Sequence, residues 1–192
     1  GFEHLPEEGA LLLINHQSYL DPLLVGAPLL RPVSFLARDD LFRVPFVSWI
    51  IRNTYVMPIS RESAGTASIR ESIRRIHHGF YVGIFPEGTR SLDGSIGELK
   101  PGFLMLARMA KAPIIPVGIA GAYRVYPKNA WCVRPGCVRV VYGKPFPPEW
   151  FTAKGSKSDQ QELLAHTRQR MQEVLNDANA WRDVSLRQDV ES

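Results

Sequence analysis

A histidine and an aspartate five positions apart are the first residues in this sequence whose types and spacing suit catalysis. His16 directly follows an apolar run and Asn15, and Asp21 comes five positions later. A neutral imidazole accepts a proton near pH 7, and a carboxylate on its other ring nitrogen selects the tautomer and stabilises the imidazolium. Because no protein nucleophile accompanies the pair, we expect it to activate a hydroxyl group of a substrate.

The same two residues also have a structural interpretation. Asp21 precedes Pro22, and an aspartate N-cap followed by proline at the first helical position is a common helix start. His16 can likewise be a hydrogen-bonded histidine at the end of a strand. The two interpretations are compatible, because a capping aspartate keeps a second oxygen for a nearby imidazole.

A second polar segment, residues 86–91, follows another expected strand. Gly88 allows the backbone to turn tightly, and Arg90 supplies a planar guanidinium that suits a phosphate or a carboxylate. Turns with glycine, threonine and arginine are common on protein surfaces. The segment is therefore evidence for a functional site only in combination with the first one.

Together, the two segments resemble the glycerolipid acyltransferase family, the enzymes that acylate glycerol-3-phosphate and lysophosphatidic acid. The first family block, Asn-His, four residues and Asp, is matched by Asn15, His16 and Asp21. The third block, Phe-Pro-Glu-Gly-Thr-Arg-Ser, is matched at every position of residues 85–91.

Two weaker blocks stand in the family's order. Residues 55–61 fit the second block in part, since Tyr55 stands near a common glycine and Ser60 stands where an aspartate is frequent. Residues 112–117 fit the fourth block, an apolar strand around a proline. The resemblance covers residues 14–120.

The resemblance implies a role for each matched residue. His16 would take the proton of an acceptor hydroxyl while Asp21 orients it, and the oxygen would attack the thioester of acyl-CoA or acyl carrier protein. The implied acceptor contacts are Arg61, Glu87, Gly88, Thr89, Arg90 and Lys100. For Lys100, an ordinary loop lysine is an equal alternative. Asn15 is a candidate oxyanion donor, with packing at the strand end as its equal alternative. The chemistry implies no metal and no bound cofactor.

The implied function is transfer of an acyl chain to a glycerol-phosphate-type acceptor. The expected acceptor is 1-acyl-glycerol-3-phosphate, which would give phosphatidic acid. One alternative is an acyltransferase for another lysophospholipid or a lyso-aminolipid. The other is a non-catalytic module that binds lipid surfaces, which the presence of His16, Asp21 and residues 87–90 disfavours.

The rest of the chain supplies the elements that position these residues. A length of 192 residues with 45 % hydrophobic and 22 % charged residues is ordinary for one globular domain. Hydrophobic runs and periodicity predict strands at 11–14, 33–37, 54–59, 80–85, 113–119 and 137–142, and helices at 22–30, 43–52, 65–78, 101–111 and 158–179. This alternation predicts a single α/β domain with a mixed central sheet flanked by helices.

The chain divides by expected role, although we expect one domain. Residues 1–150 would form the acyltransferase catalytic domain, and residues 151–192 the C-terminal linker and helix of the same domain. The Pro-rich residues 144–157 read as a linker. Beyond Trp181 the chain is polar, so we expect it to fray.

The net charge of +4 is unevenly distributed. Residues 31–75 carry eight arginines against four carboxylates, which favours an anionic acceptor and an anionic membrane surface. Nucleic acid is disfavoured, because no recognition helix or RNA-binding motif is present. The apolar stretch 41–51 fits a buried helix first, and alternatively an interfacial helix or the wall of an acyl-chain channel.

We expect the protein to act peripherally on the cytoplasmic face of a membrane. No apolar run approaches the roughly 18 residues that a span requires, and the start does not resemble a signal peptide. The chain begins at Gly1 rather than Met, so an anchor upstream stays open. Cys132 and Cys137 flank a predicted hairpin turn, and we expect them to stay reduced.

Overall fold

The apolar run that precedes His16 is a central strand of the sheet. The computed structural model describes residues 1–38, 57–59, 66–128, 130–147, 149–152 and 156–191. Strand β1 (Ala10–Ile14) pairs in parallel with β4 (Tyr81–Ile84) and with β5 (Ile114–Ala120). All residues of these three strands are buried, which explains their continuous apolar sequences, since a parallel sheet is covered on both faces.

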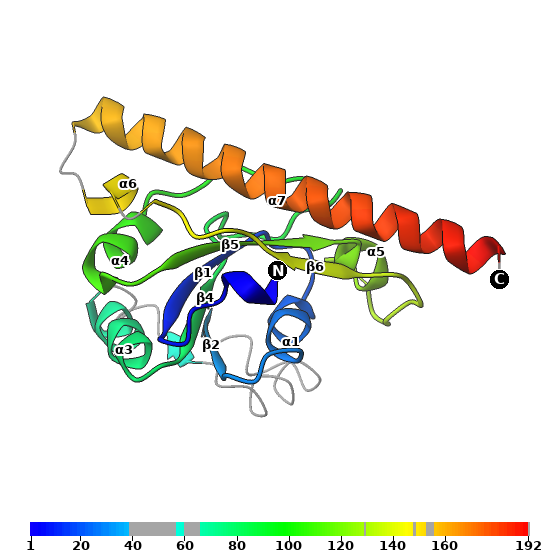
Figure 1. Ribbon diagram of the computed structural model, residues 1–192, viewed down its shortest axis with the longest axis horizontal. Coiled ribbons are helices and arrows are strands. Elements are labelled where there is room, and N and C mark those ends of the chain that lie inside the picture. Colours follow the sequence, from blue (N-terminus) through cyan, green and yellow to red (C-terminus); the bar gives the residue numbers. More distant parts are fainter. Residues whose placement is uncertain (39–56, 60–65, 129, 148, 153–155, 192) are drawn as a thin grey trace.

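Within the described residues the sheet has six strands, in the order β3-β2-β4-β1-β5-β6 (Figure 1). Strand β2 (Val33–Arg38) is parallel to β3 (Met57–Ile59) and to β4. Strand β6 (Arg139–Tyr142) is antiparallel to β5. The prediction of an α/β fold with a mixed sheet flanked by helices is therefore confirmed.

Alternate side chains of β1 belong to two separate cores. Leu11 and Leu13 pack in one cluster with α3 (Thr66–His77), α4 (Phe103–Ala110) and α7 (Lys157–Glu191). Leu12 and Ile14 pack in the other cluster with α1 (Asp21–Gly26). This is the period-two alternation of a strand. It places helices on both faces of the sheet.

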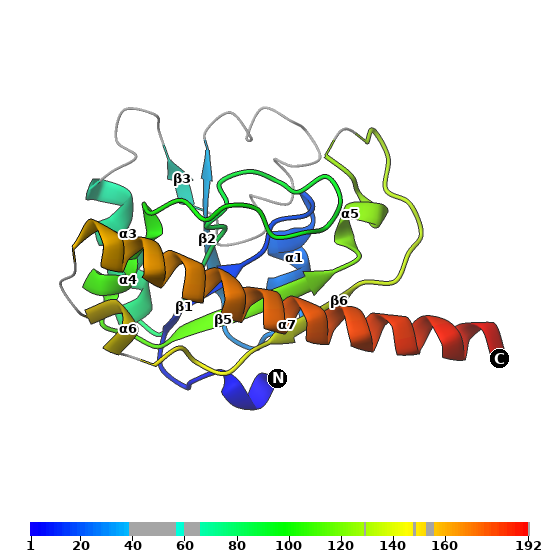
Figure 2. The ribbon, with the colours of Figure 1, turned by 90° about the horizontal axis from the view of Figure 1, so that it is seen from above.

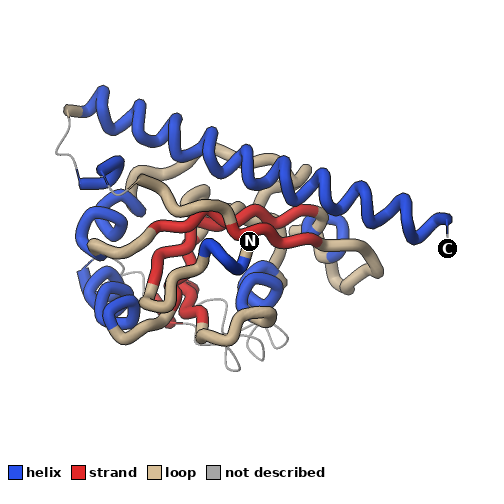
Figure 3. Tube along the Cα trace, viewed as in Figure 1, coloured by secondary structure: helices blue, strands red, loops and turns tan. Residues whose placement is uncertain are grey.

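The long helix α7 crosses strands β5 and β6 (Figure 3). Gly118 of β5 permits this close approach, because a Cβ atom there would lie 2.6 Å from the carbonyl oxygen of Val174. Met171 and Leu175 are buried against the sheet. The C-terminal helix is therefore packed against the same sheet as the first motif.

Several boundaries differ from the expectations. Helix α7 continues to Glu191, so the predicted fraying after Trp181 is wrong. The reason is a contact with β6: the Arg139 guanidinium carbon lies 4.9 Å from the centre of the Trp181 ring, and Arg139 donates to the Ser185 hydroxyl at 3.2 Å. The expected helix 22–30 ends at Gly26, shortly before Pro28, which has no N–H to continue it.

Short helices occupy three places where none was expected. They are a 3₁₀ turn η1 (Phe2–His4), α5 (Ala122–Val125) and α6 (Glu149–Thr152), the last within the presumed linker. The expected helix 43–52 and the apolar stretch 41–51 lie outside the described residues. Among the described helices, none is long and apolar enough to cross a bilayer.

The carboxyl ends of the parallel strands meet at one edge of the sheet, which we name the catalytic edge. The segments that follow β1, β4 and β5 all start there, as Figure 2 shows along its upper side. In α/β sheets this edge is where ligands bind. Both sequence motifs are therefore brought together by topology.

Candidate active site

The two residues of the first motif form a hydrogen-bonded pair at the catalytic edge. Nδ1 of His16 lies 2.8 Å from Oδ2 of Asp21. The aspartate side chain is completely buried, while the imidazole is 19 % exposed. With Nδ1–H donating to the carboxylate, Nε2 is the nitrogen that can accept a proton.

Asp21 also shapes the loop that carries the histidine. Its Oδ2 accepts the backbone N–H groups of Gln17 and Ser18 at 2.6 and 2.8 Å. The helix-capping interpretation is wrong, because Leu20 is the N-cap of α1 and no side chain caps it. Asp21 is the first helical residue, and its contacts point back along the chain. Its other oxygen, Oδ1, is buried and has no hydrogen-bond partner among the described residues.

A stack of aromatic rings supports the imidazole. The rings of His16 and Phe85 are parallel within 20° at a centroid distance of 4.0 Å, and Phe85 stacks in turn on Phe35 at 5.9 Å. Gly83 leaves the room for this stack, since a Cβ atom there would lie 2.4 Å from the Phe35 ring. Strands β2 and β4 therefore help to set the plane of the imidazole.

Glu87 is part of the support beneath His16. Its side chain is buried, with Oε1 accepting the His16 N–H at 2.9 Å and Oε2 accepting the Gly97 N–H at 2.8 Å. Burial raises the pKa of Glu87, and the two backbone N–H groups oppose that rise. The His16 carbonyl in turn accepts the Ser91 N–H at 2.7 Å. Residues of the third block therefore hydrogen-bond to both the N–H group and the carbonyl group of His16.

Two amides of the first segment connect it to β5 and to the sequence that follows β4 and β5. Asn15 accepts the Ile119 N–H at 2.7 Å and donates to the Ile119 carbonyl at 3.0 Å. Gln17 donates to the Gly94 carbonyl at 2.9 Å and accepts the Tyr123 N–H at 3.3 Å. The contacts of Asn15 favour the packing alternative over an oxyanion donor. Nothing in the sequence singled out Gln17 except its place inside the motif.

Arg90 lies on the solvent side of this support. Its guanidinium carbon is 3.5 Å from the centre of the Tyr19 ring, and Nη1 donates to the Lys128 carbonyl at 3.4 Å. The stacked ring leaves guanidinium N–H groups in its plane for another partner. Lys128 was not among the expected residues. It donates from Nζ to the Thr89 hydroxyl at 3.4 Å.

Lys100 reaches the same turn from the other end of the loop. A Cβ atom on Gly88 would lie 3.0 Å from the Lys100 ammonium, so the side chain lies directly over Gly88. Gly88 has φ +67°, a conformation that side chains strain. Three basic groups, Arg90, Lys100 and Lys128, therefore lie at the turn formed by residues 88–90. Arg61, the fourth expected cation, lies outside the described residues.

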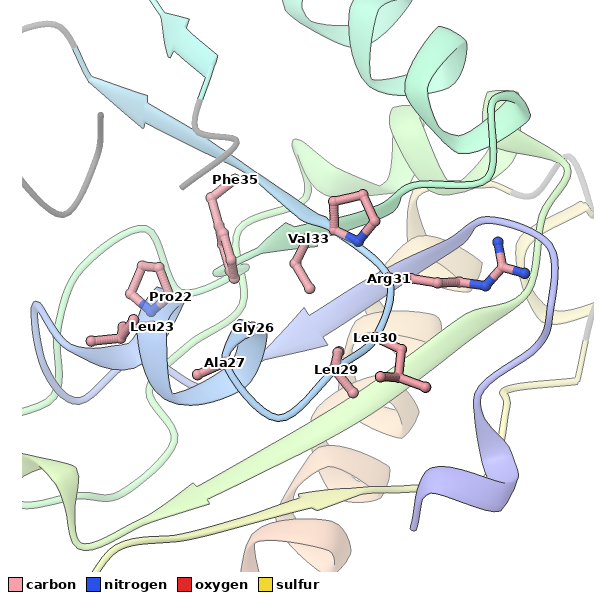
Figure 4. A pocket seen from close by; sticks show the side chains of 10 residues that line it. Pro22, Leu23, Gly26, Ala27, Leu29, Leu30, Arg31, Val33 and Phe35 are labelled. Carbon is pink, nitrogen blue, oxygen red and sulfur yellow. The ribbon is translucent and has the colours of Figure 1, made fainter. Parts of the chain in front are cut away.

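An apolar cavity of about 330 Å³ begins at Pro22, the residue after Asp21 (Figure 4). It lies between α1 and the start of β2, and Pro22 and Leu23 line its end near Asp21. Phe35, the last ring of the stack behind His16, lines it as well. Arg31 lies at the end away from the catalytic edge. We name this cavity the α1 groove.

The described part of the chain holds no cluster of three or more potential metal ligands. Cys132 and Cys137 are free thiols, and Cys132 is exposed. Among the described residues, the catalytic edge carries an imidazole–carboxylate pair and nearby cations.

Comparisons with known proteins find related sequences. The Acyltransferase family model matches residues 1–120. The 1-acyl-sn-glycerol-3-phosphate acyltransferase of Bacillus subtilis is 27 % identical, over 91 % of this chain and 85 % of its own length. The enzyme of the same name from Pseudomonas aeruginosa is 31 % identical over 74 % of this chain. The chain spans 56 % of that relative, and 50 % of a chloroplastic one from Brassica napus.

A solved structure shares the fold. The crystal structure of the 1-acyl-sn-glycerophosphate acyltransferase PlsC from Thermotoga maritima superposes with a TM-score of 0.67 at 28 % sequence identity. The match covers 91 % of this chain and 68 % of that one.

Proposed function

This chain belongs to the Acyltransferase family, and we propose that it transfers an acyl chain from a thioester donor to the free hydroxyl of 1-acyl-glycerol-3-phosphate. The product would be phosphatidic acid. The observation that carries the proposal is the His16–Asp21 pair, held at the catalytic edge with Nε2 as the available base. The names of the relatives support the acceptor.

The reaction uses the pair as a proton carrier. Nε2 of His16 takes the hydroxyl proton while the oxygen attacks the thioester carbonyl, and Asp21 stabilises the imidazolium. The tetrahedral intermediate then releases the thiolate, and the His16 imidazolium donates its proton to that leaving group. General-base catalysis of this kind contributes about 10²–10⁴-fold. Acyl-CoA or acyl carrier protein would be the donor.

The cations beside residues 88–90 would hold the acceptor phosphate. Arg90 offers a planar fork whose face already rests on Tyr19, and Lys100 and Lys128 add charge. Guanidinium groups bind phosphate through two parallel hydrogen bonds. Arg61 keeps the same expected role. Glu87 takes a different one: it would position the His16 backbone instead of contacting the acceptor, because both its oxygens are engaged.

The α1 groove would receive the acyl chain of the donor. It is lined mainly by apolar side chains and begins beside Asp21, so a chain lying in it would place its thioester near His16. Its volume of about 330 Å³ is at the lower end of the range of ligand pockets, about 300–1,000 Å³. Peripheral attachment to the cytoplasmic face of a membrane remains part of the proposal.

A transfer assay tests the proposal. Radiolabelled acyl-CoA and acyl carrier protein are offered with lysophosphatidate, glycerol-3-phosphate, a lysophospholipid and a lyso-aminolipid. We expect transfer to lysophosphatidate, and its loss to below about a tenth in His16→Ala. His166→Ala is the matched control, since that histidine is exposed on α7. Full turnover by His16→Ala would rule out the base, and preference for an acceptor without phosphate would rule out the substrate.

A further inference from the structure

The segment between α5 and β6 carries an exposed tryptophan at the catalytic edge. We name residues 127–138 the α5–β6 loop; all but residue 129 are described. It projects outward from the sheet beside the segments that carry the motifs (Figure 2). Trp131 is 93 % exposed and Val133 is 47 % exposed. Trp131 is not buried within the protein and lies beside the candidate active site. Its exposure together with that of Val133 indicates a surface for contact with another molecule.

Along the sequence, the segment that contains this tryptophan carries charges of one sign. Residues 99–148 contain eight lysines and arginines and no aspartate or glutamate. Lys128 and Arg134 flank Trp131 in the loop itself, and Arg134 is exposed. Aromatic and basic side chains interleaved in this way suit the boundary between lipid headgroups and acyl chains, where the ring is buried and the cations meet anionic headgroups.

The loop is attached to both the scaffold and the site. The Arg134 N–H donates to the Val125 carbonyl at 2.8 Å, which ties the loop back to α5. At its beginning, Lys128 contacts Thr89 and Arg90 through its ammonium and its carbonyl. Whatever binds the tip is therefore directly connected to the turn where the acceptor phosphate would lie.

We infer that the α5–β6 loop docks on an anionic lipid bilayer by inserting Trp131 among the headgroups, with Arg134 against lipid phosphates. It presents the catalytic edge to the membrane. A lysolipid then enters from the bilayer rather than from solution, a consequence that rests on the proposed function.

Fluorescence quenching tests the docking surface. Vesicles of phosphatidylglycerol and phosphatidylcholine with brominated acyl chains quench a tryptophan that enters the bilayer. We expect quenching of the wild-type protein and the loss of most of it in Trp131→Phe. Trp181→Phe is the matched control, because Trp181 is an exposed ring on α7. Undiminished quenching in Trp131→Phe, or no quenching of the wild type, would overturn the inference.

Charge reversal at Arg134 tests the basic part of the docking surface. Arg134→Glu should weaken co-sedimentation with these vesicles about fivefold or more at low salt, with a smaller effect at high salt. Lys144→Glu is the control: it lies in the same basic segment and is exposed, but at the opposite edge of the sheet, beyond the Val117–Tyr142 pair. Equal losses for the two variants would leave only a general effect of net charge and would refute the local surface.

An activity comparison separates this inference from the proposed function. Trp131→Ser should keep turnover with a soluble short-chain lysophosphatidate and lose it with an acceptor embedded in vesicles. Equal activity on both acceptors would contradict docking by this loop. If the wild type transfers no acyl chain at all, the proposed function fails, while the quenching measurement still decides the docking surface.

Discussion

The two sides of the catalytic edge are built on different principles. The base side, His16 with Asp21 and Glu87, is held by buried side chains that accept backbone N–H groups. The cation side, Arg90 with Lys100 and Lys128, consists of long side chains that are at most partly buried. This contrast indicates that the proton-transfer geometry is preorganised, whereas the groups that would meet the acceptor keep room to adjust.

The charge of the base side gives the largest expected effect. In Asp21→Asn the amide oxygen can still accept the Gln17 and Ser18 N–H groups, so the loop keeps its shape. The imidazolium loses its counter-charge, and we expect turnover to fall about 10²–10⁴-fold at a nearly unchanged melting temperature. Steady-state rates and thermal unfolding of the same preparation check this. Asp93→Asn is the control, since that carboxylate is exposed in a surface turn.

A prediction for Arg90 tests the cation side. Arg90→Ala should raise the KM for lysophosphatidate about 10–100-fold, the range for losing hydrogen bonds to a charged group, with the KM for acyl-CoA nearly unchanged. Arg90→Lys should restore little, because the planar fork that lies over Tyr19 is lost. An equal rise of both KM values would indicate that Arg90 supports the loop instead of binding the acceptor. The distinction between the base side and the cation side would then be refuted.

Glu87 tests whether the base side works through positioning. Glu87→Gln replaces one accepting oxygen by a donor that faces a backbone N–H, at His16 or at Gly97. We expect kcat to fall about tenfold or more and the KM for lysophosphatidate to change little. A raised KM with unchanged kcat would instead indicate direct contact with the acceptor. Glu98→Gln is the control, because Glu98 is an exposed neighbour in the same loop.

The pKa of Glu87 predicts the direction in which the stability of the wild type changes with pH relative to this variant. Burial raises that pKa above its ordinary value of 4.5, so the folded state binds the proton more tightly than the unfolded state. The corresponding stability is present below pH 4.5 and is lost as the pH rises through the raised pKa. Wild-type stability should therefore fall relative to Glu87→Gln as the pH rises from about 4 towards 7, the direction that linkage requires. Thermal unfolding across this range checks the sign.

The sequence predicted the base side better than the rest of the site. Its central pair, His16 and Asp21, lies five positions apart in the chain, and the resemblance that the motifs supported is confirmed by the family match. Lys128 was missed because it reaches Thr89 from 39 positions away, and no local pattern encodes that distance. The continuation of α7 past Trp181 was missed for the same reason, because its partner Arg139 is on β6.

The α1 groove gives the smallest expected effect and extends the comparison to the donor. Gly26→Leu would place a side chain in the groove, where a Cβ atom meets Val33 at an ordinary 3.8 Å. The helix should therefore persist while the cavity shortens, and we expect a several-fold shift towards shorter acyl-CoA donors, as about 0.8 kcal/mol is lost for each methylene that is no longer buried. Competition between acyl-CoA species of different length measures the shift. Gly102→Leu is the matched control, because nothing lies within 4 Å of a Cβ atom there. An unchanged chain-length profile in Gly26→Leu would remove the groove from the donor site and leave its occupant to be found elsewhere along the catalytic edge.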